Sequence, residues 1–321
     1  MRTTTLASLT AWLVAAAMGG MVRAEPVEVA VTILPEAFVV DRIGGSHVRT
    51  ATLVAAGQSP HTFEPTIRQI TRIAEADVYF SIGLPFEDSL LAKIRRMNPA
   101  IMVVELSEGI RPAPTTQKAD DHDEADHHEE HDEGHHEHEE EGEEDHHDHG
   151  SIDPHIWMNP RYMERMAAKV EATLSGIDPS HREEYRKNHQ TLKVELETLD
   201  RKIAKALKPF AGGKMFVFHA AFGHFAEAYG LEQVTVEVGG KEPTAKQLTG
   251  LIDLAGRENI RTIFVQPQFS RKSAEAVARA IGAELVVLDP LAYEYVKNLD
   301  QTAKEVRRAM QRQAGKETEG Q

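Results

Sequence analysis

The longest helical pattern in the chain is DPSHREEYRKNHQTLKVELETLDRKIAKAL, residues 178–207. Asp178-Pro179 is typical of a helix start, and the apolar side chains that follow are separated by three, four or seven positions. This spacing places them on one face of a helix, while Arg, Lys and Glu occupy the other face. At a helical rise of about 1.5 Å per residue, the pattern predicts a helix of roughly 40 Å. The apolar positions are Tyr185, Leu192, Leu196, Leu199, Ile203 and Leu207.

Short apolar runs alternate with amphipathic helical patterns on both sides of this helix. Such alternation is typical of α/β architecture, and a lone helix of this length is more than a crossover between two strands needs. We therefore predict two α/β lobes bridged by a single long helix, with residues 25–178 in the N-terminal lobe, 179–211 in the bridging helix and 212–321 in the C-terminal lobe. The expected strands are residues 27–33, 48–54, 78–82 and 101–106, then 214–219, 233–238, 261–265 and 284–288.

The first 24 residues have the pattern of a secretory signal peptide. Arg2 supplies the positive charge, residues 6–22 are mostly apolar, and Val22-Arg23-Ala24 forms a small-x-small cleavage site. A retained membrane helix is the alternative, but the stretch is shorter than the roughly 20 apolar residues of a membrane span. The chain contains no cysteine, so disulfides, thiolate metal sites and acylation of a lipoprotein cysteine are excluded. We expect a freely soluble periplasmic protein.

Residues 120–149 contain ten His and seventeen Asp or Glu, with no Lys or Arg. A segment so poor in apolar residues cannot offset its ordering entropy, so we predict a disordered loop over 119–150. Interleaved imidazoles and carboxylates indicate multi-site, weakly selective metal binding, although an acidic linker with incidental His is the simpler alternative. The other residues have 34 acidic against 36 basic side chains, so the folded body is nearly neutral. That balance argues against a nucleic-acid partner.

A selective metal site is predicted from four separate residues, which lie in loops or at strand ends. Three imidazoles and one carboxylate, two ligands from each half of the chain, suit one ion held in roughly tetrahedral geometry between the lobes. Each has a simpler interpretation as a hydrogen-bonded loop histidine or, for the Asp before Pro290, as a turn residue. The four candidates are His61, His155, His219 and Asp289. We expect His224 to lie next to the site or on the surface, and His47, His181 and His189 to face solvent.

Six motifs of the chain resemble the solute-binding proteins of zinc and manganese ABC transporters, in the same order along nearly the whole length. The resemblance implies two lobes joined by a rather rigid helix, a metal bound between the lobes, and ligands at His61, His155, His219 and Asp289. It also implies a partner ABC permease with its ATPase, and a His- and acid-rich loop before the second ligand. The motifs are Ser59-Pro-His-Thr-Phe-Glu-Pro-Thr66, Asp153-Pro-His-Ile-Trp157, Phe218-His-Ala-Ala-Phe-Gly223, Lys241-Glu-Pro-Thr-Ala-Lys-Gln247, Phe264-Val-Gln-Pro-Gln268 and Leu288-Asp-Pro-Leu291.

Zinc is the favoured cargo, because imidazole suits Zn²⁺ whereas Mn²⁺ prefers more oxygen donors. In the manganese branch of the family the third ligand tends to be Glu, and here it is His219. Some zinc members have an acid before the first histidine; this chain has Pro60, which leaves a fifth ligand or water open. A manganese transporter component and a periplasmic zinc buffer or chaperone remain alternatives. A zinc hydrolase is disfavoured because Asp289 would fill the open position, so we expect a protein that is not an enzyme. A monomer is the default expectation.

Overall fold

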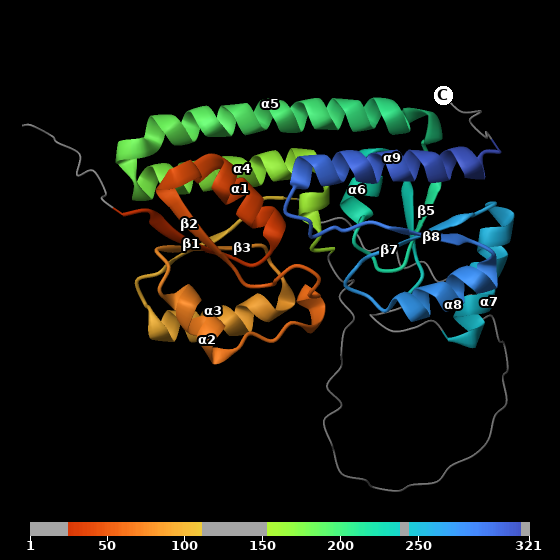
Figure 1. Ribbon diagram of the computed structural model, residues 1–321, viewed down its shortest axis with the longest axis horizontal. Helices are drawn as coiled ribbons and strands as arrows, with labels where there is room; N and C mark the ends of the chain where they lie inside the picture. Colours follow the sequence, from red (N-terminus) through yellow and green to blue (C-terminus); the bar gives the residue numbers. More distant parts are fainter. Residues whose placement is uncertain (1–24, 111–152, 238–243, 316–321) are drawn as a thin grey trace, which may run out of the picture.

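The computed structural model describes residues 25–110, 153–237 and 244–315, and in these ranges the strands form two parallel four-stranded sheets (Figure 1). The sheets repeat one topology, in which the first strand of each lobe lies between the second and the third. The N-terminal sheet has the order β2-β1-β3-β4, from β1 (Val27–Val31), β2 (Val48–Thr52), β3 (Val78–Ser81) and β4 (Met102–Glu105). The C-terminal sheet has the order β6-β5-β7-β8, from β5 (Lys214–Val217), β6 (Glu232–Thr235), β7 (Thr262–Val265) and β8 (Glu284–Val287).

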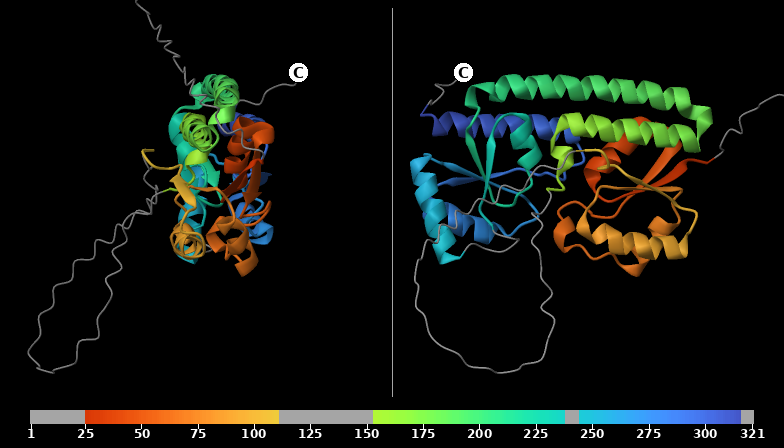
Figure 2. Two further views of the ribbon diagram at one scale, coloured as in Figure 1. Left: turned by 90° about the vertical axis from the view of Figure 1, so that its left-hand side faces the viewer. Right: turned by 180° about the vertical axis from the view of Figure 1, so that it is seen from behind.

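Helices cover both faces of each sheet, because parallel strands are connected by crossovers that bury both faces. In the N-terminal lobe α2 and α3 lie on the face opposite α1 and α4, and in the C-terminal lobe α7 and α8 lie opposite α9 (Figures 1 and 2). The bounds are α1 (Leu34–Gly44), α2 (Ile67–Ala74), α3 (Pro85–Met97), α4 (Pro160–Ile177), α6 (Gly223–Ala228), α7 (Ala245–Arg257), α8 (Arg271–Ile281) and α9 (Tyr295–Gln313).

The helix α5 (Arg182–Leu207) runs along the top of both lobes in Figure 1 and packs against α1, α4 and α9. Its buried positions are the six apolar residues predicted from the sequence spacing. A 3-10 turn, Pro179–His181, precedes the helix, so the first residues of the predicted pattern are not α-helical. The prediction of two α/β lobes bridged by one long helix is confirmed. The boundaries proposed for the lobes stay a prediction.

Strand ends differ from the predicted ones by one to three residues, and at β5 other hydrogen bonds compete with the regular pattern. β5 ends at Val217 rather than at His219, because the backbone N–H and C=O of His219 bind the side chain of Gln266. β8 ends at Val287, ahead of the Asp289 that was expected to close it. Thr66 and Gln69, whose spacing in the sequence is typical of a capping box, form one at the start of α2: the Thr66 side chain accepts from Gln69 N–H and the Gln69 side chain accepts from Thr66 N–H.

Three sequence predictions fall outside the described residues: the signal peptide over 1–24, the His- and acid-rich loop over 119–150, and residues 241–243 of the fourth motif. In the ranges that the structure does describe, no helix combines the length and the apolar composition of a membrane span. The short 3-10 turns at Pro60–Thr62 and Ile156–Met158 lie inside these ranges, and each carries or adjoins a predicted ligand.

Candidate metal centre

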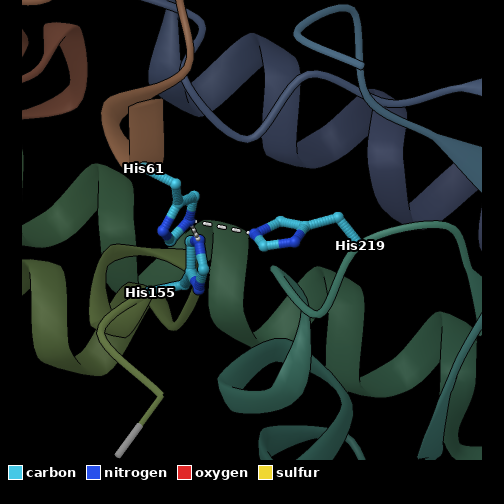
Figure 3. Close-up of side chains that lie close together, drawn as sticks. All are labelled: His61, His155 and His219. Carbon is cyan, nitrogen blue, oxygen red and sulfur yellow. Dashed lines mark hydrogen bonds between the residues drawn. The ribbon is translucent and has the colours of Figure 1, made fainter. Parts of the chain in front are cut away.

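Three of the predicted ligands converge between the two lobes (Figure 3). The Nε2 atom of His61 lies 3.4 Å from Nε2 of His155 and 3.0 Å from Nε2 of His219. Within the described residues, these three histidines form the only group of three or more His, Asp or Glu whose ligand atoms all lie within 4.8 Å of one another. Two come from the N-terminal lobe and one from the C-terminal lobe, so an ion bound here would connect the lobes.

His61 lies in the 3-10 turn Pro60–Thr62, which follows the loop after β2. The Ser59 side chain caps this turn by accepting from the backbone N–H of His61 at 3.3 Å. Pro60 is buried and fixes the first backbone angle of the turn. His61 is exposed at the surface, and its ring contacts the other two imidazoles at centroid distances of 5.4 and 4.6 Å.

His155 is buried and stands at the start of the 3-10 turn Ile156–Met158. Its Nδ1 atom lies 2.7 Å from Oδ1 of Asp153, and the same oxygen accepts from the backbone N–H of His155 at 2.9 Å. The fully buried Trp157 anchors the segment by donating from Nε1 to the carbonyl of Pro290 at 2.7 Å. The segment therefore fixes the His155 ring and also contacts the C-terminal lobe.

His219 is held by side chains that follow the other strands of its own sheet. The Gln266 amide accepts from His219 N–H at 3.3 Å and donates to His219 C=O at 2.9 Å. The Nδ1 atom of His219 is hydrogen-bonded to the carboxylate of Glu237, which is buried. Phe269 stacks on the imidazole at a centroid distance of 4.6 Å. Parallel strands bring these residues together because their carboxyl ends meet at one edge of the sheet.

Asp289 is not part of the cluster of three histidines. Its Oδ1 atom accepts from Nε2 of Gln268 at 2.9 Å and from the backbone N–H of Leu291 at 3.0 Å. The next two residues, Pro290 and Leu291, do line the pocket around the histidines. The structure therefore brings together three of the four predicted ligands, and it places the fourth beside the pocket with one carboxylate oxygen engaged.

The environment keeps the imidazoles of His61 and His155 neutral, the form that binds metal. Burial of the ring and the neighbouring His155 and His219 lower the pKa of His61 to about 3. Burial also lowers the pKa of His155, and this effect outweighs the nearby Asp153, which acts in the opposite direction. The hydrogen bonds from His155 hold the pKa of the Asp153 carboxyl below its usual value although burial opposes this. The neutral imidazoles of His61 and His155, beside the ionised carboxylate of Asp153, attract a divalent cation.

The remaining histidines differ in part from their predicted settings. His224 is fully buried, so the surface alternative is wrong; its Nε2 atom lies 3.0 Å from the carbonyl of Asp153, next to the cluster. His47, His181 and His189 are half-buried rather than solvent-facing. The rings of His47 and His181 stack with their centroids 3.7 Å apart. Oε2 of Glu184 lies 2.9 Å from Nε2 of His47.

Sequence reasoning missed the residues that hold the ligands. Asp153, Gln266 and Gln268 all stand in the six motifs, and a carboxylate two residues before a candidate ligand is a usable signal for an orienting partner. Glu237 has no comparable signal, because it lies 18 residues from His219 and meets it only through the sheet.

Comparison with known families matches residues 29–309 to the family described as zinc-uptake complex component A, periplasmic. The high-affinity zinc uptake system protein ZnuA of Yersinia pestis is 27% identical over 282 residues, 85% of this chain and 85% of that protein. The zinc-binding protein AdcA of Streptococcus pyogenes is 28% identical over 269 residues, 83% of this chain; the chain spans about half, 50%, of its length.

Solved structures give the same match. A crystal structure of ZnuA is 32% identical with a TM-score of 0.76, covering 89% of this chain and 100% of that chain. The zinc-bound 138–173 deletion mutant of ZnuA is also 32% identical, with a TM-score of 0.75 and coverage of 89% and 98%.

Proposed function

Because the chain belongs to the family of periplasmic zinc-uptake complex component A, we propose that it captures Zn²⁺ between its lobes and delivers it to an ABC permease and its ATPase. The observation that carries this proposal is the convergence of three Nε2 atoms, from both lobes, in one pocket. The relatives named for zinc binding and zinc uptake support the same cargo.

The donor set favours zinc over manganese. Three imidazole nitrogens match the ligands of a tetrahedral Zn²⁺ site, whereas Mn²⁺ prefers more oxygen donors. We propose Asp289 as the fourth ligand: one of its oxygens is engaged by Gln268 and Leu291, and carboxylate ligands are commonly hydrogen-bonded in this way. Its negative charge would offset half the charge of the ion.

The role of a transport component also explains the two-lobed arrangement. A site built from ligands of both lobes can be broken by separating them, so a permease that moves one lobe would weaken ion binding. The pattern of residues 1–24 supports export through a signal peptide. We further propose that the protein acts as a monomer, that it has no catalytic activity, and that residues 120–149 add only weaker metal binding.

The test is a competitive zinc and manganese titration of residues 25–321, compared with a variant lacking residues 120–149 and with His219→Ala. We expect one tight zinc site that survives the deletion, disappears in His219→Ala and is not displaced by equimolar manganese. His181→Ala, which changes a histidine outside the cluster, should keep the tight site. Loss of this site on deletion, or displacement of zinc by manganese, would show that the site or the cargo is wrong.

A further inference from the structure

We propose that Asp153 and Glu237 are positioning residues that fix the tautomer of His155 and His219, so that both Nε2 atoms face the ion before it binds. This inference rests on the proposed zinc-binding function. It concerns residues that are not themselves ligands: each carboxylate contacts the far nitrogen of the ring, opposite the atom that converges with the other histidines.

Asp153 contacts His155 twice, through one oxygen. Its Oδ1 atom accepts from the backbone N–H at 2.9 Å and lies 2.7 Å from ring Nδ1. The carboxylate and the ring are both buried, at 2% and 5% side-chain exposure, so water does not compete for this hydrogen bond. Because this carboxylate oxygen accepts from the backbone N–H of His155, it acts as an acceptor toward the ring as well, and Nδ1 therefore carries the proton.

Glu237 makes the equivalent contact in the other lobe. Its Oε1 atom is hydrogen-bonded to Nδ1 of His219, and its side chain is 5% exposed. Glu237 follows β6, whereas His219 follows the neighbouring β5, so the sheet register fixes the distance between the two side chains. The Gln266 amide binds the backbone of His219, which leaves Glu237 to orient the ring.

The two pairs have one chemical consequence at the centre of the cluster. With protons on Nδ1, the Nε2 atoms of His155 and His219 both present lone pairs. Both lie within 3.4 Å of Nε2 of His61, so in the metal-free protein His61 satisfies them best as the Nε2–H tautomer. When zinc binds, this proton would move from Nε2 to Nδ1 of His61, so that all three Nε2 atoms present lone pairs to the ion.

The chain contains a matched pair away from the cluster. Oδ2 of Asp178 lies 2.5 Å from Nδ1 of His181, and Asp178 is buried like Asp153 and Glu237. His181 does not belong to the group of converging ligand atoms. Asp178→Asn therefore removes a buried carboxylate beside a histidine without touching the proposed metal site.

The first measurement is zinc affinity of the full chain, by competition with a chelator of known affinity. We expect Glu237→Ala and Asp153→Ala each to weaken the tight site by about 10- to 100-fold, the usual effect of losing an outer hydrogen-bond partner of a ligand. Glu237→Gln keeps an oxygen that can accept from Nδ1–H, so its loss should be smaller. Asp178→Asn should bind zinc as the wild type does.

The second measurement distinguishes a loss of imidazole orientation from a general destabilisation of the fold. Long-range ¹H–¹⁵N spectra of the metal-free protein report which ring nitrogen carries the proton; we expect Nδ1–H for His155 and His219 in the wild type, and loss of that preference for His219 in Glu237→Ala. Unchanged tautomers, unchanged affinity in both Ala variants, or an equal loss in Asp178→Asn would overturn the inference. Failure of the wild type itself to bind one zinc ion tightly would instead overturn the proposed function.

Discussion

At the scale of single residues, Gly223 is positioned where a larger side chain would collide with Asp153. A Cβ atom at this position would lie 2.4 Å from Oδ2 of Asp153, closer than real Cβ contacts allow. The Asp153 carboxylate, which is hydrogen-bonded to His155, would have to move away from the added Cβ atom. Because the Asp side chain is short, this movement would displace the carboxylate as a whole. We predict that Gly223→Ala weakens zinc binding by roughly tenfold, the lower end of outer-partner effects.

The matched control for this prediction is Gly250 in α7, where an added Cβ atom would have no neighbouring atom within 4 Å. Gly250→Ala should leave zinc affinity unchanged and stabilise the fold by about 0.5–1 kcal/mol, because Gly is unfavourable inside a helix. Zinc competition and urea unfolding of both variants test the pair. Equal zinc affinities for Gly223→Ala and Gly250→Ala would show that a Cβ atom at position 223 does not disturb the Asp153 carboxylate enough to affect binding.

The clustered histidines predict how the stability of the metal-free protein changes with pH. The pKa of His61 falls from its ordinary value of 6.5 to about 3, and the pKa of His155 is also lowered. Between these values the unfolded chain binds more protons than the folded one, so the free energy of unfolding decreases as pH falls below 6.5. Urea unfolding at intervals between about pH 4.5 and 7.5, with a chelator present, measures this decrease.

Two buried carboxyl groups act in the opposite direction. Burial raises the pKa of Glu36 and of Glu87 above the ordinary value of 4.5, so above pH 4.5 the folded protein binds more protons and loses stability as pH rises. His61→Gln removes the contribution of His61 and leaves that of the two carboxyl groups. The stability of this variant should therefore decline less steeply than that of the wild type between about pH 6.5 and 4.5, and parallel curves would contradict the lowered pKa of His61.

At the scale of elements, α5 is stabilised by its buried face rather than by its composition. Leu196 is 1% exposed in the core, whereas Val194, two residues earlier, is 50% exposed. Leu196→Ala should lower the free energy of unfolding by about 2–5 kcal/mol, because it leaves a cavity in packed surroundings. Val194→Ala should change it by less than about 0.5 kcal/mol. Urea unfolding of both metal-free variants tests this, and similar losses would mean that α5 is not packed through this face.

The elements that the sequence predicted well are those with a local signal. The face of α5 follows from spacing alone, and the start of α2 follows from Thr66 and Gln69, because both patterns lie within a few residues. The end of β5 was misplaced, because the competing hydrogen bonds to His219 come from Gln266, 47 residues away. The order of the strands had no local signal either.

The candidate site also contains features that the sequence predicted and contacts that it did not predict. Three histidines were predicted from their positions in loops or at a strand end, and the family resemblance implied the same residues. The structure brings those three together. The engagement of Asp289 by Gln268 and the contact of Glu237 with His219 were not predicted. Both depend on side chains from different strands, and single-sequence reasoning has no measure of such distances.

At the scale of the whole molecule, the two lobes are connected by more than α5. One continuous apolar core extends from the N-terminal sheet along α5 and α9 into the C-terminal lobe. Trp157 donates to the carbonyl of Pro290, and the Tyr293 hydroxyl donates to Asp41 at 2.8 Å, so the segment after Asp289 contacts the N-terminal lobe directly. A permease that separates the lobes would therefore have to break these contacts as well as the metal site.

This connection predicts that zinc stabilises both lobes together. A ligand present at about 1,000 times its Kd stabilises the folded state by about 4.1 kcal/mol, which slows exchange through global unfolding roughly 1,000-fold. Because His61 and His155 belong to one lobe and His219 to the other, the slowing should reach β1 and β3 as well as β5 and β7. Hydrogen–deuterium exchange with and without zinc measures it. His219→Ala should abolish the slowing in both sheets, and the control His181→Ala should leave it unchanged in both. Slowing confined to one sheet would mean that zinc does not bridge the lobes.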